Sequence, residues 1–312
     1  MTVGSVTRYG PELKDAWDGV VRNSKNGTFL HLRDYMDYHA DRFTDCSLLF
    51  QENGKVVAVF PCSAHGDSVV SHGGLTYGGL IYGKDVHATT VLSMFDTLAE
   101  HFKAAGFQKV VYKPVPRVFH TYPADEDLYA LFRMSARLYR RDLSSVIELA
   151  TRPKFSDSRK NTARKAPKAG ARFEEIDDTE GFHALLASVL ARFGSSPVHS
   201  VAELRLLKSR FPENIRLFGV LLEDRLLAAS LVFDLGPGVH TQYMAASDEG
   251  RALGALDFLL VNLIENTFSE KQYLSFGIST EQQGQFLNEG LIKQKEGFGG
   301  RGMVHDFYEW DL

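Results

Sequence analysis

The sequence predicts an α/β (α+β) protein of two similar domains, each a mixed, largely antiparallel sheet flanked by helices. The first observation is the order of elements in residues 215–278, which read as a strand meander, a loop, a helix and a further strand. The second is that residues 46–115 repeat this order at an offset of roughly 160 to 170 residues, which indicates a duplicated domain rather than a short-period repeat array.

Turn residues separate the strands of the later copy. The apolar runs LFGVLL and LAASLVF flank a polar turn at residues 223–225, and Gly236-Pro237-Gly238 closes a hairpin before HTQYMA. A loop over residues 247–255 leads into a helix, and the strand YLSFG follows it. The apolar side chains of this helix recur every three or four residues, at Leu256, Leu259, Leu260, Leu263, Ile264 and Phe268. Backbone amides at the start of such a helix are expected to bind an anion.

The earlier copy has the same signals. An Asn-Gly turn at residues 53–54 and a short hairpin at residues 66–67 separate three strands before a glycine-rich loop. A helix follows with one apolar face and a stop at Gly106, and KVVYKPV is the next strand. Each copy closes with a helix and a long strand, so we expect domains at residues 1–150 and 151–312.

Composition is that of an ordinary globular chain. The 312 residues suffice for two domains of about 150 residues, and the hydrophobic fraction is 44%. A net charge of −4 favours neither a DNA-binding protein nor a membrane-surface protein. Residues 1–15 have no signal-peptide pattern and no apolar run reaches membrane-spanning length, so a cytoplasmic protein is expected, with its oligomeric state left open.

A basic segment joins the two halves. Residues 152–172 contain eight lysines and arginines against a single acid, Asp157. A helix over residues 158–169 would bring Lys160, Arg164 and Lys168 to one side. This side is either the solvated face of a linker or a set of phosphate contacts.

The two cysteines do not form a metal-binding pattern. Cys46 and Cys62 fall in or beside predicted strands and lack the paired spacing of a zinc site. We expect two buried free thiols and no metal cofactor.

Four stretches together resemble the Fem-like acyltransferases, which are built from two tandem GNAT (Gcn5-related N-acetyltransferase) domains. The stretches are SRKNTARKAPKAGARFEEI, QYMAASDEGRALGALDFLL, YLSFGIST and NEGLIKQKEGFGGR. The likeness covers essentially the whole chain, since SHGGLTYGG and PADEDLYALF resemble the N-terminal domain of family members found among surface-polysaccharide genes. It implies an enzyme of the cell-envelope polysaccharide pathways that transfers an acyl group.

The resemblance implies a cofactor site for acyl-CoA in the second half. Arg251 and Gly254 match the start of the GNAT pyrophosphate loop, although the last small residue of that motif is Leu256 here and Ala255 lies one position early. Phe276 and Gly277 match the strand end beside which the thioester arm runs. The oxyanion donor of GNAT proteins is a backbone amide of the preceding strand, which corresponds to residues 242–245 here and includes Gln242 and Met244. The element Lys295, Phe298, Gly299 matches the Lys-x-x-Phe-Gly pattern that closes the second domain.

Acyl transfer to an amine needs a proton acceptor for the amine, donors for the oxyanion and a proton for the leaving group. The candidates on strands that we expect to border the site are Tyr243, His305, Asp306 and Tyr308, together with His240. A histidine has a suitable pKa for a base, and a tyrosine can protonate a thiolate. Each also has a structural alternative, as a hydrogen-bonded strand residue or a packing aromatic.

The first half has no arginine in its equivalent of the phosphate loop, so we expect it to bind the acceptor instead. Candidate acceptor-binding residues are Ser71, His72, Tyr77, Lys113, His120, Arg159 and Arg164. For the first five the alternative is that they are ordinary polar residues of strands and hairpins. The acidic run at residues 125–127 is most simply the N-terminal cap of a helix.

Three functions remain open from the sequence. The first is an N-acyltransferase that moves an acyl group, such as acetyl, from acyl-CoA to an amine, for example an amino sugar of a surface-polysaccharide precursor. The second is a Fem-type aminoacyl transferase that uses aminoacyl-tRNA, favoured by the basic segment and opposed by the net negative charge. The third is a catalytically silent GNAT-fold binding protein, which the imperfect phosphate loop permits.

Overall fold

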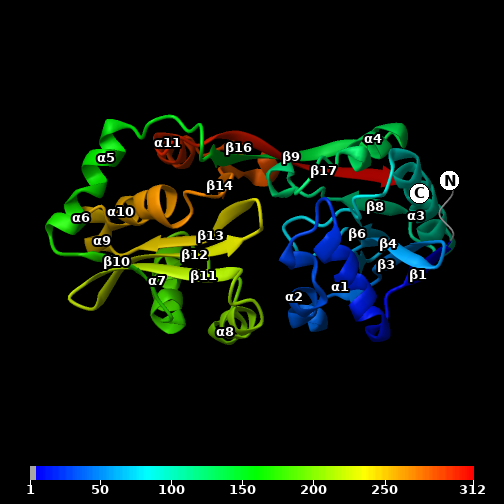
Figure 1. The fold of residues 1–312 in the computed structure, drawn as a ribbon, viewed down its shortest axis with the longest axis horizontal. Coiled ribbons are helices and arrows are strands. Elements are labelled where there is room, and N and C mark those ends of the chain that lie inside the picture. The colour runs from blue at the N-terminus through cyan, green and yellow to red at the C-terminus, as the bar shows by residue number, and fades with distance from the viewer. Residues whose placement is uncertain (1–4) are drawn as a thin grey trace. The chain divides into compact units, whose positions relative to one another are not determined.

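The computed structural model describes residues 5–312, which divide into two compact units (Figure 1). The first unit contains the chain as far as Asp142 together with Val304–Leu312, and the second contains Leu143–Met303. Two long strands, β9 (Arg137–Glu148) and β17 (Arg301–Asp311), connect them along the chain. The last strand therefore returns the chain to the first unit.

The first unit contains two sheets. A four-stranded antiparallel sheet has the order β1-β3-β4-β7, and a second sheet has the order β17-β8-β6-β5-β2, in which only β6 and β8 are parallel. The strands are β1 (Ser5–Arg8), β2 (Thr44–Asp45), β3 (Leu48–Glu52), β4 (Lys55–Phe60), β5 (Ser63–His65), β6 (Ser68–Val70), β7 (Ile81–Tyr82) and β8 (Lys109–Tyr112). The helices are α1 (Lys14–Asn23), α2 (Arg33–Met36), α3 (Ala88–Ala104) and α4 (Glu126–Arg133), with short 3₁₀ turns at Pro11–Leu13, Phe29–His31, Asp37–Arg42 and Arg117–Phe119.

The second unit is built on one six-stranded sheet of order β10-β11-β12-β13-β14-β9. Its strands are β10 (Arg172–Glu175), β11 (Ile215–Leu222), β12 (Arg225–Asp234), β13 (Gly238–Ala246), β14 (Tyr273–Ile278) and β9, and only β13 and β14 are parallel. Its helices are α5 (Asp157–Ala163), α6 (Lys165–Lys168), α7 (Thr179–Ala191), α8 (Val201–Arg210), α9 (Asp248–Ala252), α10 (Ala255–Asn262) and α11 (Glu289–Gly297). A π turn at Leu263–Thr267 extends α10, a small hairpin joins β15 (Thr280–Glu281) to β16 (Phe286–Leu287), and a 3₁₀ turn at Gln282–Gly284 lies between these two strands.

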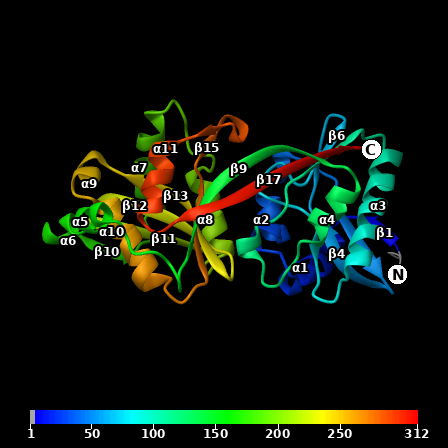
Figure 2. The same ribbon diagram turned by 90° about the horizontal axis from the view of Figure 1, so that it is seen from above.

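Helices cover both faces of the six-stranded sheet (Figures 1 and 2). Helices α7 and α8 contact β11, β12 and β13 on one face, and α10 contacts the same strands on the other, with α5 and α6 beside it. The apolar residues predicted for the helix at 256–268 lie against the sheet as expected, because Leu259, Leu260, Leu263 and Ile264 are fully buried. We call the α10 side face A and the α7 side face B.

Local sequence signals explain several element boundaries. The side chain of Asp178 caps α7 at the amide of Gly181, and Ser200 and Glu203 form a reciprocal capping box at the start of α8. The polar turn after β11 and the Gly236 hairpin lie where they were predicted. The single helix expected over residues 158–169 is instead two short helices that meet at Arg164, with Pro167 in the second.

The acidic run at residues 125–127 does more than begin α4. Asp125 makes no side-chain cap, whereas Glu126 accepts hydrogen bonds from Lys25 and Tyr82 at 2.7 Å each. Asp127 is buried and accepts from the Tyr112 hydroxyl, and burial raises the pKa of its carboxyl to about 7. These bonds tie α4 to the core of the first unit.

Candidate active site

The strands β13 and β14 separate after a short parallel contact. Pairing joins Gly238, Val239 and His240 to Tyr273, Leu274 and Ser275 and then stops, although both strands continue. At Gly277 the backbone of β14 has a φ of +75°, and the pairing of β14 with β9 shifts register between Ser275 and Ile278. The two strands therefore diverge beyond His240 and Ser275, and we call the region between their continuing backbones the β13–β14 slot.

A β-bulge in β13 lies beside this slot. The ladder with β12 pairs Val232 with Thr241 and Leu231 with Tyr243, so Gln242 has no partner in β12. It also lies two residues beyond the last pair with β14. This position makes the backbone amide of Gln242 the candidate hydrogen-bond donor to an oxygen atom between the two strands.

Residues paired across a sheet share a face, which places His240 and Tyr243 on face B. The Tyr243 hydroxyl lies 2.7 Å from Nδ1 of His199, and its ring contacts Phe182 of α7. Burial raises the pKa of Tyr243. This tyrosine–histidine pair is the strongest candidate in the second unit for moving a proton.

The sequence did not point to His199. It precedes the capping box of α8 by one residue and is 44 positions from Tyr243, so only the packing of α7 and α8 on face B brings the two together. A sequence signal for its role is absent, because the preceding residues SSPV resemble any polar loop.

A second polar group supports the bend in β14. Nδ1 of His240 lies 3.1 Å from the hydroxyl of Ser275, whose oxygen also accepts from the amide of Gly277. The buried Lys295 of α11 donates to the carbonyl oxygens of Gly277 and Ile278 at 2.9 and 2.7 Å. Burial lowers the pKa of its amine to about 8. Lys295 therefore holds the bent end of β14 in place.

The N-terminus of α10, where we expected a diphosphate, is covered by α5. Gly254 has a φ of +66°, and a Cβ at this position would collide with the carbonyl oxygen of Thr162. Arg159 of α5 donates to the carboxylate of Asp257 in the first turn of α10 at 2.7 Å. Burial raises the pKa of Asp257, and the neighbouring Arg159 opposes that shift. The chain's own carboxylate thus occupies the positive end of this helix.

The other residues expected to hold the cofactor have different surroundings. Arg251 donates to the carbonyl of Ala246 at 2.9 Å and to Asp248 in its own helix, α9, which replaces the predicted loop. Ala255 is fully buried, Met244 packs against the face A core, and Phe276 is buried against Phe298. In this conformation these residues and Gly254 do not form an open cradle for the diphosphate of acyl-CoA.

The residues expected to bind the acceptor in the first unit hold its glycine-rich loop. Ser71, His72, Tyr77 and Lys113 are buried. The backbone amide of Lys113 donates to the Ser71 hydroxyl at 2.7 Å, and its amine donates to the carbonyls of His72 and Leu75. His120 lies 2.9 Å from the carbonyl of Val115. Lys113 directly follows β8 and fastens the glycine-rich loop to it, so these residues have a structural role in the first unit.

His305, Asp306 and Tyr308 lie on the part of β17 that belongs to the first unit. Burial lowers the pKa of His305 to about 4, so its imidazole is neutral at pH 7 and is a weak base. Asp306 is paired with Arg141 through two hydrogen bonds of 2.6 and 2.7 Å and also accepts from Tyr308. Arg159 and Arg164, the remaining candidates, lie on or at the end of α5 in the second unit.

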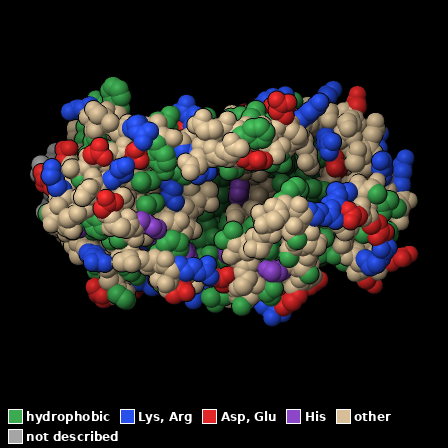
Figure 3. Space-filling model, turned by 180° about the vertical axis from the view of Figure 1, so that it is seen from behind, with side chains coloured by type: hydrophobic (Ala, Val, Ile, Leu, Met, Phe, Trp, Pro, Cys, Tyr) green, Lys and Arg blue, Asp and Glu red, His purple; other side chains and the backbone are tan. Residues whose placement is uncertain are grey.

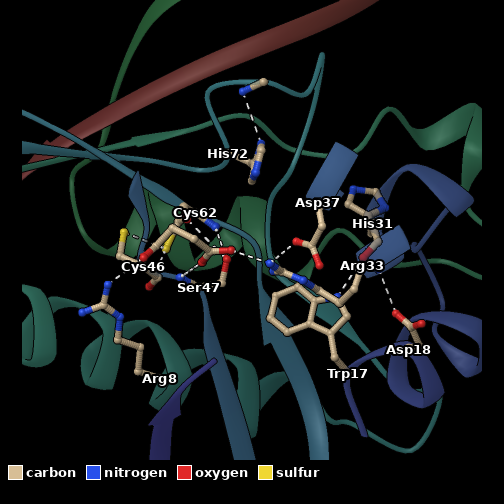
Figure 4. A network of polar contacts seen from close by, with 12 residues as sticks. Arg8, Trp17, Asp18, His31, Arg33, Asp37, Cys46, Ser47, Cys62 and His72 are labelled. Atoms are coloured by element: carbon tan, nitrogen blue, oxygen red, sulfur yellow. Dashed lines mark hydrogen bonds and ion pairs between the residues drawn. The ribbon is translucent and has the colours of Figure 1, made fainter. Parts of the chain in front are cut away.

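A buried polar network stabilises the N-terminal part of the first unit (Figure 4). Arg33 pairs with Asp37 and Asp45 at 2.5 and 2.6 Å, and its guanidinium stacks over the ring of Tyr9 at 3.7 Å. Cys46 and Cys62 are buried free thiols, as predicted, with their sulfur atoms 3.4 Å apart. Within residues 5–312, no cluster of His, Cys, Asp or Glu has the arrangement of a metal site, and no helix is both long and apolar enough to be a membrane span.

Comparison with known proteins identifies the part of the chain that carries the slot. Residues 153–282 match the acetyltransferase (GNAT) domain family. No curated protein sequence matches significantly.

Solved structures extend the similarity to the whole chain. FemX aligns with a TM-score of 0.69 and 12% identity, covering 99% of this chain and 97% of its own. L-PGS from Bacillus licheniformis aligns with a TM-score of 0.64 and 12% identity, covering 97% of this chain and 92% of its own. A tandem GNAT protein of the clavulanic acid pathway aligns with a TM-score of 0.52 and 10% identity, covering 98% of both chains.

Proposed function

Because the chain has the fold of the Fem-like acyltransferases with two GNAT domains, we propose that it transfers an aminoacyl group from aminoacyl-tRNA to an amine, with the β13–β14 slot as the acyl site. The observation that carries the choice of donor is the position of α5 over the N-terminus of α10. The acyltransferase assignment itself follows from the fold and the matched domain.

The slot can hold the acyl group of the donor ester between two backbones. Its carbonyl oxygen would accept a hydrogen bond from the amide of Gln242, the extra residue of the bulge. Such a preorganised donor stabilises the negative charge that develops on this oxygen when the amine attacks. In the balanced step, the amine nitrogen forms a bond to the carbonyl carbon, and the bond from that carbon to the ribose oxygen breaks.

Tyr243 and His199 supply the proton transfer that this step requires. The amine loses a proton as it attacks, and the departing ribose oxygen gains one. A tyrosine hydroxyl with a raised pKa is protonated at pH 7 and can donate to that oxygen, while the imidazole 2.7 Å away accepts or returns the proton. No covalent enzyme intermediate is needed.

The charge distribution favours a nucleic-acid donor only locally. Basic and acidic side chains are interspersed over the face of the molecule in Figure 3, and the net charge of the chain is −4. Helices α5 and α6, in contrast, contain Arg159, Lys160, Arg164, Lys165 and Lys168 with one acid, Asp157. Contacts from such a segment to phosphates would give tRNA binding a steep salt dependence.

Transfer from acyl-CoA is the second candidate, favoured by the matched acetyltransferase (GNAT) domain and by the strand end at Phe276 and Gly277, beside which the family resemblance places the thioester arm. The covered helix terminus opposes it, since the diphosphate would need α5 to move away and the Arg159–Asp257 pair to break. The amine acceptor belongs to both candidates, and an amino sugar of a surface-polysaccharide precursor remains our expectation for it.

The test offers both donors to the full chain with the same acceptors, amino-sugar nucleotides and free amines. We expect labelled aminoacyl groups to move from charged tRNA to an acceptor, with no thiol released from acetyl-CoA. We also expect CoA to leave the unfolding free energy unchanged, whereas a ligand at 100 times its dissociation constant adds about 2.7 kcal/mol. Thiol release with CoA stabilisation would instead establish the second candidate, and inactivity with both donors would indicate a binding protein.

A further inference from the structure

A groove lies between helices α5–α6 and helix α10 on face A of the second unit. It has a volume of about 360 Å³. This volume lies within the range of small-ligand sites, about 300–1,000 Å³. No residue of the groove belongs to the Tyr243–His199 pair, which lies on face B.

The floor of the groove is apolar and partly aromatic. Its apolar residues are Phe155, Ala163, Pro167, Phe258 and Val261. Phe258 and Val261 are only half-buried, although both lie on α10. The ring of Phe155 contacts that of Phe298 at 5.7 Å, and Phe298 contacts Phe276 of β14 at 6.2 Å. A line of aromatic rings therefore connects the groove to the strand that borders the acyl slot.

The rim of the groove is positively charged. Arg164 is exposed, and within residues 5–312 no hydrogen bond or ion pair holds its side chain. Lys160 has only an exposed contact to Asp157 at 3.5 Å. The single carboxylate of the rim, Glu265, is already paired with Arg152 at 2.8 Å. An anion at this rim would meet two cations and a neutralised acid.

We infer that this groove binds an unpaired nucleotide from the single-stranded end of the donor RNA, with its base against Phe258 and its phosphate at Arg164 and Lys160. An apolar aromatic floor with a basic rim is the combination by which proteins hold single-stranded nucleic acid, because a base stacks and a phosphate pairs. The inference rests on the proposed function. It adds a subsite that would hold the end of the donor RNA on face A, while the aminoacyl group reacts on face B.

The experiment measures binding of a labelled eight-nucleotide single-stranded RNA ending in CCA by fluorescence anisotropy at two salt concentrations. Wild-type chain is compared with Phe258→Ala, Phe258→Leu and Arg164→Gln, and with Arg172→Gln as the matched control. Arg172 is also exposed in the second unit, but it lies on β10 and faces Asp224. Arg164→Gln changes an exposed side chain, so it tests the inference even if a Phe258 variant is unstable.

We expect Phe258→Ala to weaken RNA binding by at least about 5-fold, the lower end for loss of one stacked base, and Phe258→Leu to weaken it less. Arg164→Gln should reduce the slope of log affinity against log salt concentration by the equivalent of about one phosphate contact. Arg172→Gln should leave both the affinity and this slope unchanged. Wild-type affinity in both Phe258→Ala and Arg164→Gln, no RNA binding by the wild type, or displacement of the RNA by CoA at equal concentration would each overturn the inference.

Aminoacyl transfer measured on the same samples separates the two proposals. Active transfer from charged tRNA, together with unaltered RNA binding by the groove variants, would overturn the inference about the groove but not the proposed function. Groove-dependent RNA binding without transfer to any amine would support the groove and count against the proposed function.

Discussion

Tyr243 and His199 are the two side chains on which the proposed proton transfer depends. Their contact of 2.7 Å is half-buried on face B, beside the bulge at Gln242. A hydroxyl in such a position can serve both as an acid and as a structural hydrogen-bond donor. Removal of the hydroxyl lowers the turnover rate in the first role and the melting temperature in the second.

Replacement of Tyr243 by Phe removes the hydroxyl and keeps the ring that packs against Phe182. If the hydroxyl protonates the leaving group, the turnover rate should fall by about 10²- to 10⁴-fold with little change in melting temperature. Transfer kinetics and a thermal melt check this, with Tyr129→Phe as control because Tyr129 is exposed on α4. A fall of less than about 3-fold would exclude Tyr243 as the general acid.

His31 should make the protein sensitive to acid. It is fully buried, its Nδ1 accepts from the amide of Thr28, and burial lowers its pKa from 6.5 to about 4. Between these values the unfolded chain binds a proton that the folded chain does not, so stability is complete above pH 6.5 and decreases as the pH falls. For His31 alone the loss at pH 5 is about 2 kcal/mol.

Urea titrations of wild type and His31→Gln at pH 7.5 and pH 5 measure this loss. The variant keeps an acceptor for Thr28, and its decrease in unfolding free energy should be smaller by about 2 kcal/mol. The two proteins must be compared with each other, because Asp127 also contributes to the pH dependence of stability. Its pKa is raised to about 7, so its contribution to the unfolding free energy is lost as the pH rises, which is the opposite of the effect of His31. Equal decreases would show that His31 is not buried in its neutral form.

At the scale of elements, the contact of α5 with α10 is the observation on which the proposed choice of donor rests. The sequence predicted the two slot strands and the helix between them, and the structure confirms β13, α10 and β14. It could not predict that α5 would cover Gly254, because that contact joins residues nearly a hundred positions apart through a backbone carbonyl. It also could not predict His199, since the interaction with Tyr243 depends on how α7 and α8 pack.

Two glycine substitutions test the α5–α10 contact. Gly254 and Gly194 have nearly the same φ, +66° and +67°, but only Gly254 faces another element. Gly194→Ala should cost about 1–2 kcal/mol of stability from backbone strain alone. Gly254→Ala should cost about 1–3 kcal/mol more, because the new methyl group meets the Thr162 carbonyl.

Hydrogen exchange locates the effect of these substitutions. We expect faster exchange of the α5 amides in Gly254→Ala and unchanged exchange there in Gly194→Ala. Equal stability losses in the two variants, measured by denaturant titration, would mean that α5 is not packed on the terminus of α10 in solution.

At the scale of the whole molecule, the sequence predicted the last strand but not its partners in the sheet. The pattern at the C-terminus predicted a helix and a long strand, and α11 and β17 confirm both. The destination of β17 depends on partners far away in the chain: Tyr308–Asp311 pair with Tyr112–Lys109, and Trp310 is buried in the core of the first unit. Periodicity within a strand carries no information about such partners.

Deletion of residues 304–312 should therefore destabilise the first unit, although the deletion is at the opposite end of the sequence. Loss of a buried tryptophan alone costs about 3–5 kcal/mol, a large part of the 5–15 kcal/mol that stabilises a typical domain. Limited proteolysis followed by mass spectrometry should find new cleavages before residue 142 in the shortened chain. Cleavage confined to residues 143–303 would contradict this assignment of the strand.

The two thiols described above have a practical consequence. Cys62 is inaccessible and Cys46 is only 7% exposed, so a maleimide dye will leave the native chain almost unlabelled. A cysteine introduced at an exposed position of α5, such as Asn161, would then be the sole reactive group, and a fluorophore attached there would report in real time whether that helix lifts when a donor arrives.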